Sequence, residues 1–85
     1  MAKSTFTEAY GVLLHALVAA RKDAGVTQVE LAERLAKPQS FVSKIETGER
    51  RLDVVEFCAV AIALEIDGPE FLKFVLSRLP AKIDI

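Results

Sequence analysis

Residues that start or stop helices recur along the chain and divide it into short segments. The spacing of a capping box, with a hydroxyl or carboxylate residue followed three positions later by Glu, occurs at Thr5–Glu8, Thr27–Glu30 and Asp53–Glu56. In such a box each side chain binds the backbone N–H of the other residue, which satisfies donors that a helix start leaves free. The residues that can end or restart a helix lie between these boxes: Gly25, Pro38, Gly48, Pro69 and Pro80.

These signals predict five helices. The first follows Thr5 and ends at Gly25, and the others cover about 27–35, 38–48, 53–65 and 69–79. No stretch alternates apolar and polar residues as a half-buried strand would. Of the 85 residues, 52% are hydrophobic, which is enough to form a core. The sequence therefore predicts one compact all-α domain over residues 1–80, followed by a tail at 81–85.

Composition argues against several classes of protein. The longest uncharged stretch, residues 9–20, is too short to cross a membrane, and the polar N-terminus lacks the apolar region of a signal peptide. The single Cys58 cannot form an internal disulfide, and in its apolar surroundings we expect it in the core. No catalytic triad, metal-ligand cluster or glycine-rich phosphate loop is present, and His15 has no partner at ligand spacing. We expect a cytoplasmic protein that is not an enzyme and binds no metal or cofactor.

Charge is distributed unevenly, although the net charge is only −1. Residues 34–51 hold five basic residues against two acidic ones, a local excess of +3. Such a segment can be a solvated surface or a contact for a polyanion.

The segment at 38–48 has two distinct faces. At about 100° per residue, Val42, Ile45 and Glu46 fall on one arc. The opposite arc carries Gln39, Ser40, Ser43 and Lys44. Gln and Lys can pair with adenine and guanine edges, and Ser with either donors or acceptors. Phe41 lies at the edge of this arc, where it could touch a thymine methyl group or pack against the preceding helix, with packing the favoured interpretation.

The stretch TQVELAERLAKPQSFVSKIETGERRL resembles the helix-turn-helix of phage repressors and Cro proteins, the XRE family. The likeness extends over about residues 17–64, with the helix-turn-helix unit at about 27–48. It implies a lambda-repressor-like domain whose second helix of the unit enters the major groove, and dimeric binding to near-palindromic double-stranded DNA.

The resemblance also implies roles for individual residues. Base contacts fall to Gln39, Ser40, Ser43 and Lys44. Phosphate contacts fall to Gln28 at a helix N-terminus and to Lys37, Arg50 and Arg51. Arg21 and Glu46 match a structural ion pair between the first and third helices, and helical spacing places both on inward faces.

The turn between the two helices departs from the family pattern. Ala36 occupies a position where Gly is common because the backbone there usually takes positive φ. An alanine in that conformation costs on the order of 1 kcal/mol.

The last helix carries more apolar residues than one buried stripe requires. We therefore expect it to form the dimer interface through Phe74, with Phe71 and Val75 beside it. The alternative is that all of its apolar residues belong to the core.

The sequence thus predicts a dimeric transcriptional repressor. An antitoxin or a restriction-modification controller is an alternative within the same class, and either could have a protein partner such as a toxin. A protein-interaction module that keeps the fold without binding DNA is the alternative from another class; the acidic net charge favours it and the +3 segment argues against it.

Overall fold

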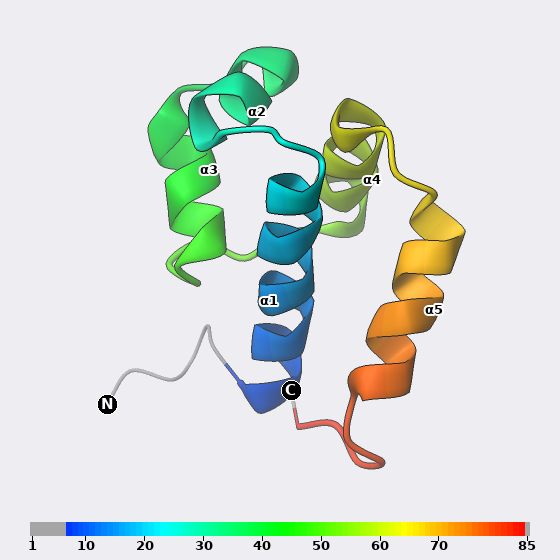
Figure 1. The fold of residues 1–85 in the computed structure, drawn as a ribbon. Helices are drawn as coiled ribbons and strands as arrows, with labels where there is room; N and C mark the ends of the chain where they lie inside the picture. The colour runs from blue at the N-terminus through cyan, green and yellow to red at the C-terminus, as the bar shows by residue number, and fades with distance from the viewer. Residues whose placement is uncertain (1–6, 85) are drawn as a thin grey trace.

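The computed structural model describes residues 7–84. Within this range the chain forms five helices, namely α1 (Glu8–Asp23), α2 (Gln28–Leu35), α3 (Gln39–Glu46), α4 (Val54–Leu64) and α5 (Gly68–Arg78). In Figure 1, α3 lies on one side of α1 and α4 and α5 on the other, with α2 across the top. The predicted all-α fold with five helices is confirmed.

Two predicted capping boxes are present. The Thr27 hydroxyl accepts from the Glu30 N–H at 3.0 Å, and the Glu30 carboxylate accepts from the Thr27 N–H at 2.8 Å. The box at Asp53 and Glu56 has the same two bonds at 2.7 and 3.0 Å. These reciprocal bonds fix where α2 and α4 begin.

Other helix boundaries differ from the predicted ones. Thr5 lies outside the described residues, and α1 is capped by Thr7, whose hydroxyl accepts from the Tyr10 N–H at 3.1 Å. Pro38 is the N-cap of α3 in an extended conformation, so the helix begins one residue later, at Gln39. Pro69 is the second residue of α5 rather than the first, because the Asp67 side chain caps a helix that begins at Gly68.

Ala36 adopts the left-handed conformation that is usual at this position of the family's turn, which the sequence alone had left open. Its φ and ψ are 57° and 43°, and the next residue, Lys37, donates its N–H to the Ala32 carbonyl at 2.9 Å. This bond satisfies a carbonyl at the end of α2 while the chain turns into α3. The strain at Ala36, about 1 kcal/mol, is retained within a well-bonded turn.

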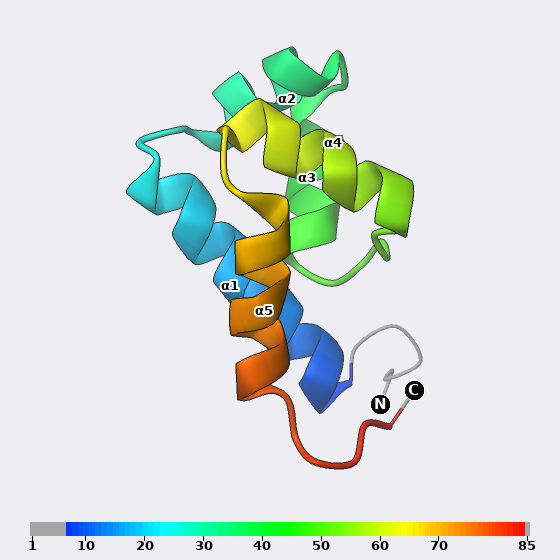
Figure 2. The same cartoon turned by 90° about the vertical axis from the view of Figure 1, so that its right-hand side faces the viewer.

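The core joins four of the helices. Its main cluster comprises Leu17, Val26, Leu31, Ala32, Val42, Val60 and Leu64. A second cluster consists of Tyr10, Leu14 and Ile45 between α1 and α3. Figure 2 shows α5 running alongside α1 below α4, and α5 packs against both helices. The core therefore holds α3 firmly by its inner face and leaves its outer face open.

The outward side of α4 is apolar and uncovered. Cys58 is exposed, so the prediction that it belongs to the core is wrong. Apolar residues surround α4, and the stripe containing Val60, Ala61 and Leu64 is the one that packs inward. Cys58 lies on the other side, as do Val55 and Ile62, which are 77% and 75% exposed.

The helices that the structure describes in residues 7–84 are all too short or too polar to cross a lipid bilayer.

Candidate nucleic-acid interface

The outer face of α3 presents the polar row identified in the sequence. Gln39, Ser40 and Lys44 are exposed and Ser43 is partly exposed. On the inner face, Val42 and Ile45 are only 2% and 5% exposed. The helix is therefore anchored by its apolar residues and offers amide, hydroxyl and ammonium groups outward.

Arg21 and Glu46 form a nearly buried ion pair that joins α1 to the last residue of α3. The Arg21 Nε and Nη2 groups donate to the two Glu46 oxygens at 2.7 and 3.0 Å. Nη1 donates to the Val26 carbonyl at 2.9 Å, and the side chains are 9% and 11% exposed. The pair lies where helical spacing and the family resemblance predict it.

Gln28 extends this pair to the start of α3. Its Nε2 donates to Glu46 Oε1 at 2.8 Å, and its Oε1 accepts from Gln39 Nε2 at 3.2 Å. A continuous chain of hydrogen bonds thus runs from Arg21 to the first exposed residue of α3, and it orients Gln39. This linking role was not predicted from the sequence, because nothing in the spacing of Gln28 and Glu46 shows that they meet. The phosphate contact assigned to Gln28 stays a prediction.

Two cations lie close to the Phe41 ring. Its ring packs against both core clusters and lies 5.3 Å from the Lys37 ammonium and 4.6 Å from the Arg50 guanidinium carbon. Cations at these distances from an aromatic ring are attracted to its face. The packing expected for Phe41 is present, and its ring also contacts the Arg50 guanidinium.

Arg50 is not a free cation in this structure. Its Nη1 and Nη2 donate to the two oxygens of Glu56 at 3.0 and 2.8 Å, and Nη1 also donates to the Arg51 carbonyl at 3.0 Å. The hydrogen bond from Arg50 and that from the Asp53 N–H lower the pKa of Glu56 to about 2. From the sequence, Glu56 was predicted only to cap the helix, and its pairing with Arg50 was not predicted.

The other predicted phosphate-binding cations are exposed. They are Lys37 in the turn and Arg51 after α3. The Arg51 guanidinium carbon lies 4.3 Å from the centre of the Tyr10 ring, and the Tyr10 hydroxyl accepts from the Leu52 N–H at 3.0 Å. The loop after α3 is therefore tied to α1, which limits the positions that its basic side chains can reach.

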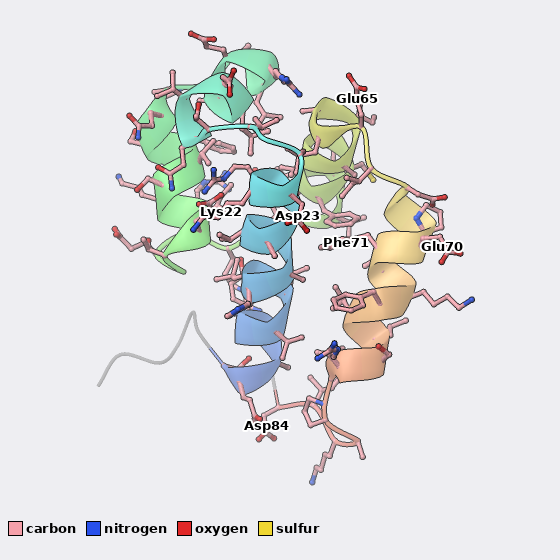
Figure 3. All side chains as sticks on the ribbon, viewed as in Figure 1. Lys22, Asp23, Glu65, Glu70, Phe71 and Asp84 are labelled. Carbon is pink, nitrogen blue, oxygen red and sulfur yellow. The ribbon has the colours of Figure 1, made fainter. Side chains whose placement is uncertain are left out.

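The three residues predicted for the dimer interface occupy different environments. Val75 is 5% exposed and packs inward, so it is a core residue rather than a surface for a second subunit. Phe71 reaches from α5 toward α4 (Figure 3), where its ring centre lies 5.8 Å from that of Phe57. Phe74 is 48% exposed, with the Arg78 guanidinium carbon 4.9 Å from its ring centre. Of the three, Phe74 keeps the most surface for a partner.

The chain is similar to known helix-turn-helix proteins in both sequence and fold. A family model described as helix-turn-helix matches residues 17–71. An XRE-family like protein from Pseudomonas syringae pv. tomato str. DC3000 is 47% identical, with a TM-score of 0.80 over 85% of this chain and 88% of that one. The clp gene regulator ClgR from C. glutamicum is 25% identical, with a TM-score of 0.75 over 89% of this chain and 99% of that one.

A mutant of the restriction-modification controller protein C.Esp1396I has the same fold. Its TM-score is 0.76 at 21% identity, over 84% of this chain and 90% of that one. Among curated proteins, none matches this sequence significantly. The extent of the helix-turn-helix match and the identity to the Pseudomonas protein show that the chain belongs to the XRE family of DNA-binding helix-turn-helix regulators.

Proposed function

We propose that the protein is a cytoplasmic, dimeric repressor that recognises a near-palindromic operator through α3. The observation that carries this proposal is the exposed row at 39, 40, 43 and 44, whose first residue is oriented by hydrogen bonds reaching back to Arg21. A side chain fixed before binding loses less entropy when it pairs with a base edge.

Base recognition falls to Gln39, Ser40, Ser43 and Lys44. Phosphate contacts fall to Lys37, Arg51 and the start of α2 at Gln28, where unpaired N–H groups and the helix dipole favour an anion. Such contacts position the domain without selecting a sequence. Arg50 is left out of this set of phosphate contacts, because Glu56 binds its guanidinium.

Selection of bound sites from random duplex DNA, followed by binding assays on the selected site, tests the proposal. Lys44→Ala should relax the preference at one base pair in each half-site and cost about 1–3 kcal/mol of specific binding. Its matched control is Arg51→Ala, which should weaken all sequences alike and lower the salt dependence by about one unit per subunit. If Lys44→Ala leaves the selected DNA motif unchanged, Lys44 is not one of the residues that read bases.

The dimer is proposed to form through α5, centred on Phe74. A two-fold contact there would bury its half-exposed ring and set two α3 helices about one DNA turn, ~34 Å, apart. Phe74→Glu should then give a folded monomer with much weaker operator binding, as measured by sedimentation and gel shift.

Ile62→Glu is the matched control for this interface, because Ile62 is a more exposed apolar residue on a different helix. If Ile62→Glu dissociates the dimer and Phe74→Glu does not, the two-fold contact lies on α4. A wild-type protein that remains monomeric at high micromolar concentration would count against both surfaces.

A protein-interaction module is the second candidate, and the uncovered side of α4 favours it. Contiguous exposed apolar surface commonly marks a contact with another protein. A gel shift with random duplex DNA at low salt separates the two functions, since non-specific phosphate binding needs no operator. Absence of any shift would favour the interaction module.

A further inference from the structure

Two groups hold the side chain of Arg50, which lies in the loop after α3. Glu56, at the start of α4, binds its guanidinium through both carboxylate oxygens. The ring of Phe41, on α3, lies 4.6 Å from the guanidinium carbon. Arg50 therefore bridges the recognition helix α3 and the start of α4.

The donors of Arg50 are largely occupied. A guanidinium has five N–H groups. Arg50 makes three N–H···O bonds, two to the Glu56 carboxylate and one to the Arg51 carbonyl. The Glu56 carboxylate also neutralises the positive charge of Arg50, which weakens its attraction to a phosphate. The salt dependence of binding is set by the number of DNA phosphates that the protein neutralises.

Glu56 is itself firmly placed. One of its oxygens, Oε1, also accepts the Asp53 N–H at 3.0 Å as part of the capping box. To release Arg50, Glu56 would have to give up two charged hydrogen bonds while the cap holds it in position. Its pKa of about 2 keeps it ionised at every pH used for DNA binding.

We infer that Glu56 withholds Arg50 from the DNA backbone, so that Arg50 is a positioning residue for Phe41 and the loop after α3 rather than a phosphate contact. This inference rests on the proposed DNA binding and refines it. The phosphate contacts on this edge then come from Arg51 and Lys37, and the Arg50–Glu56 pair sets the position of the loop from which Arg51 extends.

The test compares salt dependence among variants that differ in charge. Arg50→Gln/Glu56→Gln exchanges a neutral ion pair for two neutral amides, so the slope of log K against log salt should stay at the wild-type value. Glu56→Gln alone keeps the cap, because Gln also serves in a capping box. It should release the charge of Arg50 and steepen the slope by about one unit per subunit.

Two further variants complete the design. Arg51→Gln should make the slope shallower by about one unit per subunit and serves as the control for a true phosphate contact. Arg50→Lys keeps the charge but lacks the planar fork that binds Glu56 and stacks on Phe41. It should lower the ratio of specific to non-specific affinity several-fold, which a residue acting only as a point charge would not do. Melting curves verify that each variant is folded.

The outcomes are distinct. Wild-type protein that binds no duplex at low salt would reject DNA binding itself. If the wild type binds and the double variant loses about one unit of slope per subunit, Arg50 does contact phosphate and the inference is wrong. An unchanged slope in the double variant, with a steeper slope for Glu56→Gln, is the result expected if Glu56 holds Arg50 away from the DNA.

Discussion

Two arginine–glutamate pairs involve residues at the end of α3 or just after it, and their surroundings distinguish them. Both are forked, with Nη2···O distances of 3.0 Å in Arg21–Glu46 and 2.8 Å in Arg50–Glu56. The side chains of the first pair are 9% and 11% exposed, and those of the second are 41% and 26% exposed. The same chemical pairing therefore joins two helices in the interior in one place, and in the other it holds the loop after α3 against the start of α4 at the surface.

In the buried pair, each guanidinium nitrogen and each carboxylate oxygen has a hydrogen-bond partner. Arg21 also binds the Val26 carbonyl, and Glu46 also accepts from Gln28. Within the described residues, no buried side-chain nitrogen or oxygen lacks a partner. A buried charge whose partner is removed has no water to replace it, whereas an exposed charge is rehydrated at once.

Removing one member of the buried pair should have the largest effect. Arg21→Ala and Glu46→Ala should each cost about 3–5 kcal/mol of unfolding free energy, because each strands the other charge. Urea denaturation of both single variants and the double variant completes a double-mutant cycle. Glu33→Ala, at an exposed position of α2, is the control and should have little effect. Additive single effects, with no coupling energy, would mean that the two residues do not act as a pair.

Gln28 should give an intermediate effect, because it connects the buried pair to the recognition helix. Gln28→Ala removes one hydrogen bond to a charged oxygen and should cost about 1–2 kcal/mol of unfolding free energy. It also removes the acceptor that orients Gln39, so selected DNA sites should lose preference at the base pair read by Gln39. Normal selectivity in this variant would show that Gln39 is oriented by the DNA rather than by Gln28.

Sequence reasoning succeeded where the interaction is local. The boxes at Thr27 and Asp53 join residues three apart, so the spacing alone predicts them. The inward direction of Arg21 followed from helical spacing because α1 has a distinct apolar stripe.

Periodicity failed where the apolar residues of a helix spread beyond one stripe. In α4 and α5 the pattern does not identify the buried stripe, so Cys58 was expected inside and Val75 outside, the reverse of their positions. Glu56 shows a second limit. Its capping role was evident from spacing, but a carboxylate has two oxygens, and the partner of the second depends on how the loop after α3 folds back.

The smallest effect should come from the exposed pair, and its dependence on pH tests the comparison most directly. Glu56→Gln should lower the melting temperature much less than Glu46→Ala, because solvent screens the exposed charges. The pKa of Glu56 is lowered from 4.5 to about 2, mainly by the hydrogen bond from Arg50 and then by that from the Asp53 N–H. A lowered carboxylate pKa stabilises the folded state above the unfolded pKa, and this stabilisation is lost as pH falls through the folded value. The difference in melting temperature between wild type and Glu56→Gln should thus be constant from pH 7 to about pH 5 and disappear toward pH 2. A difference that persists unchanged at pH 2 would mean that Glu56 stabilises the loop by packing rather than by its charge.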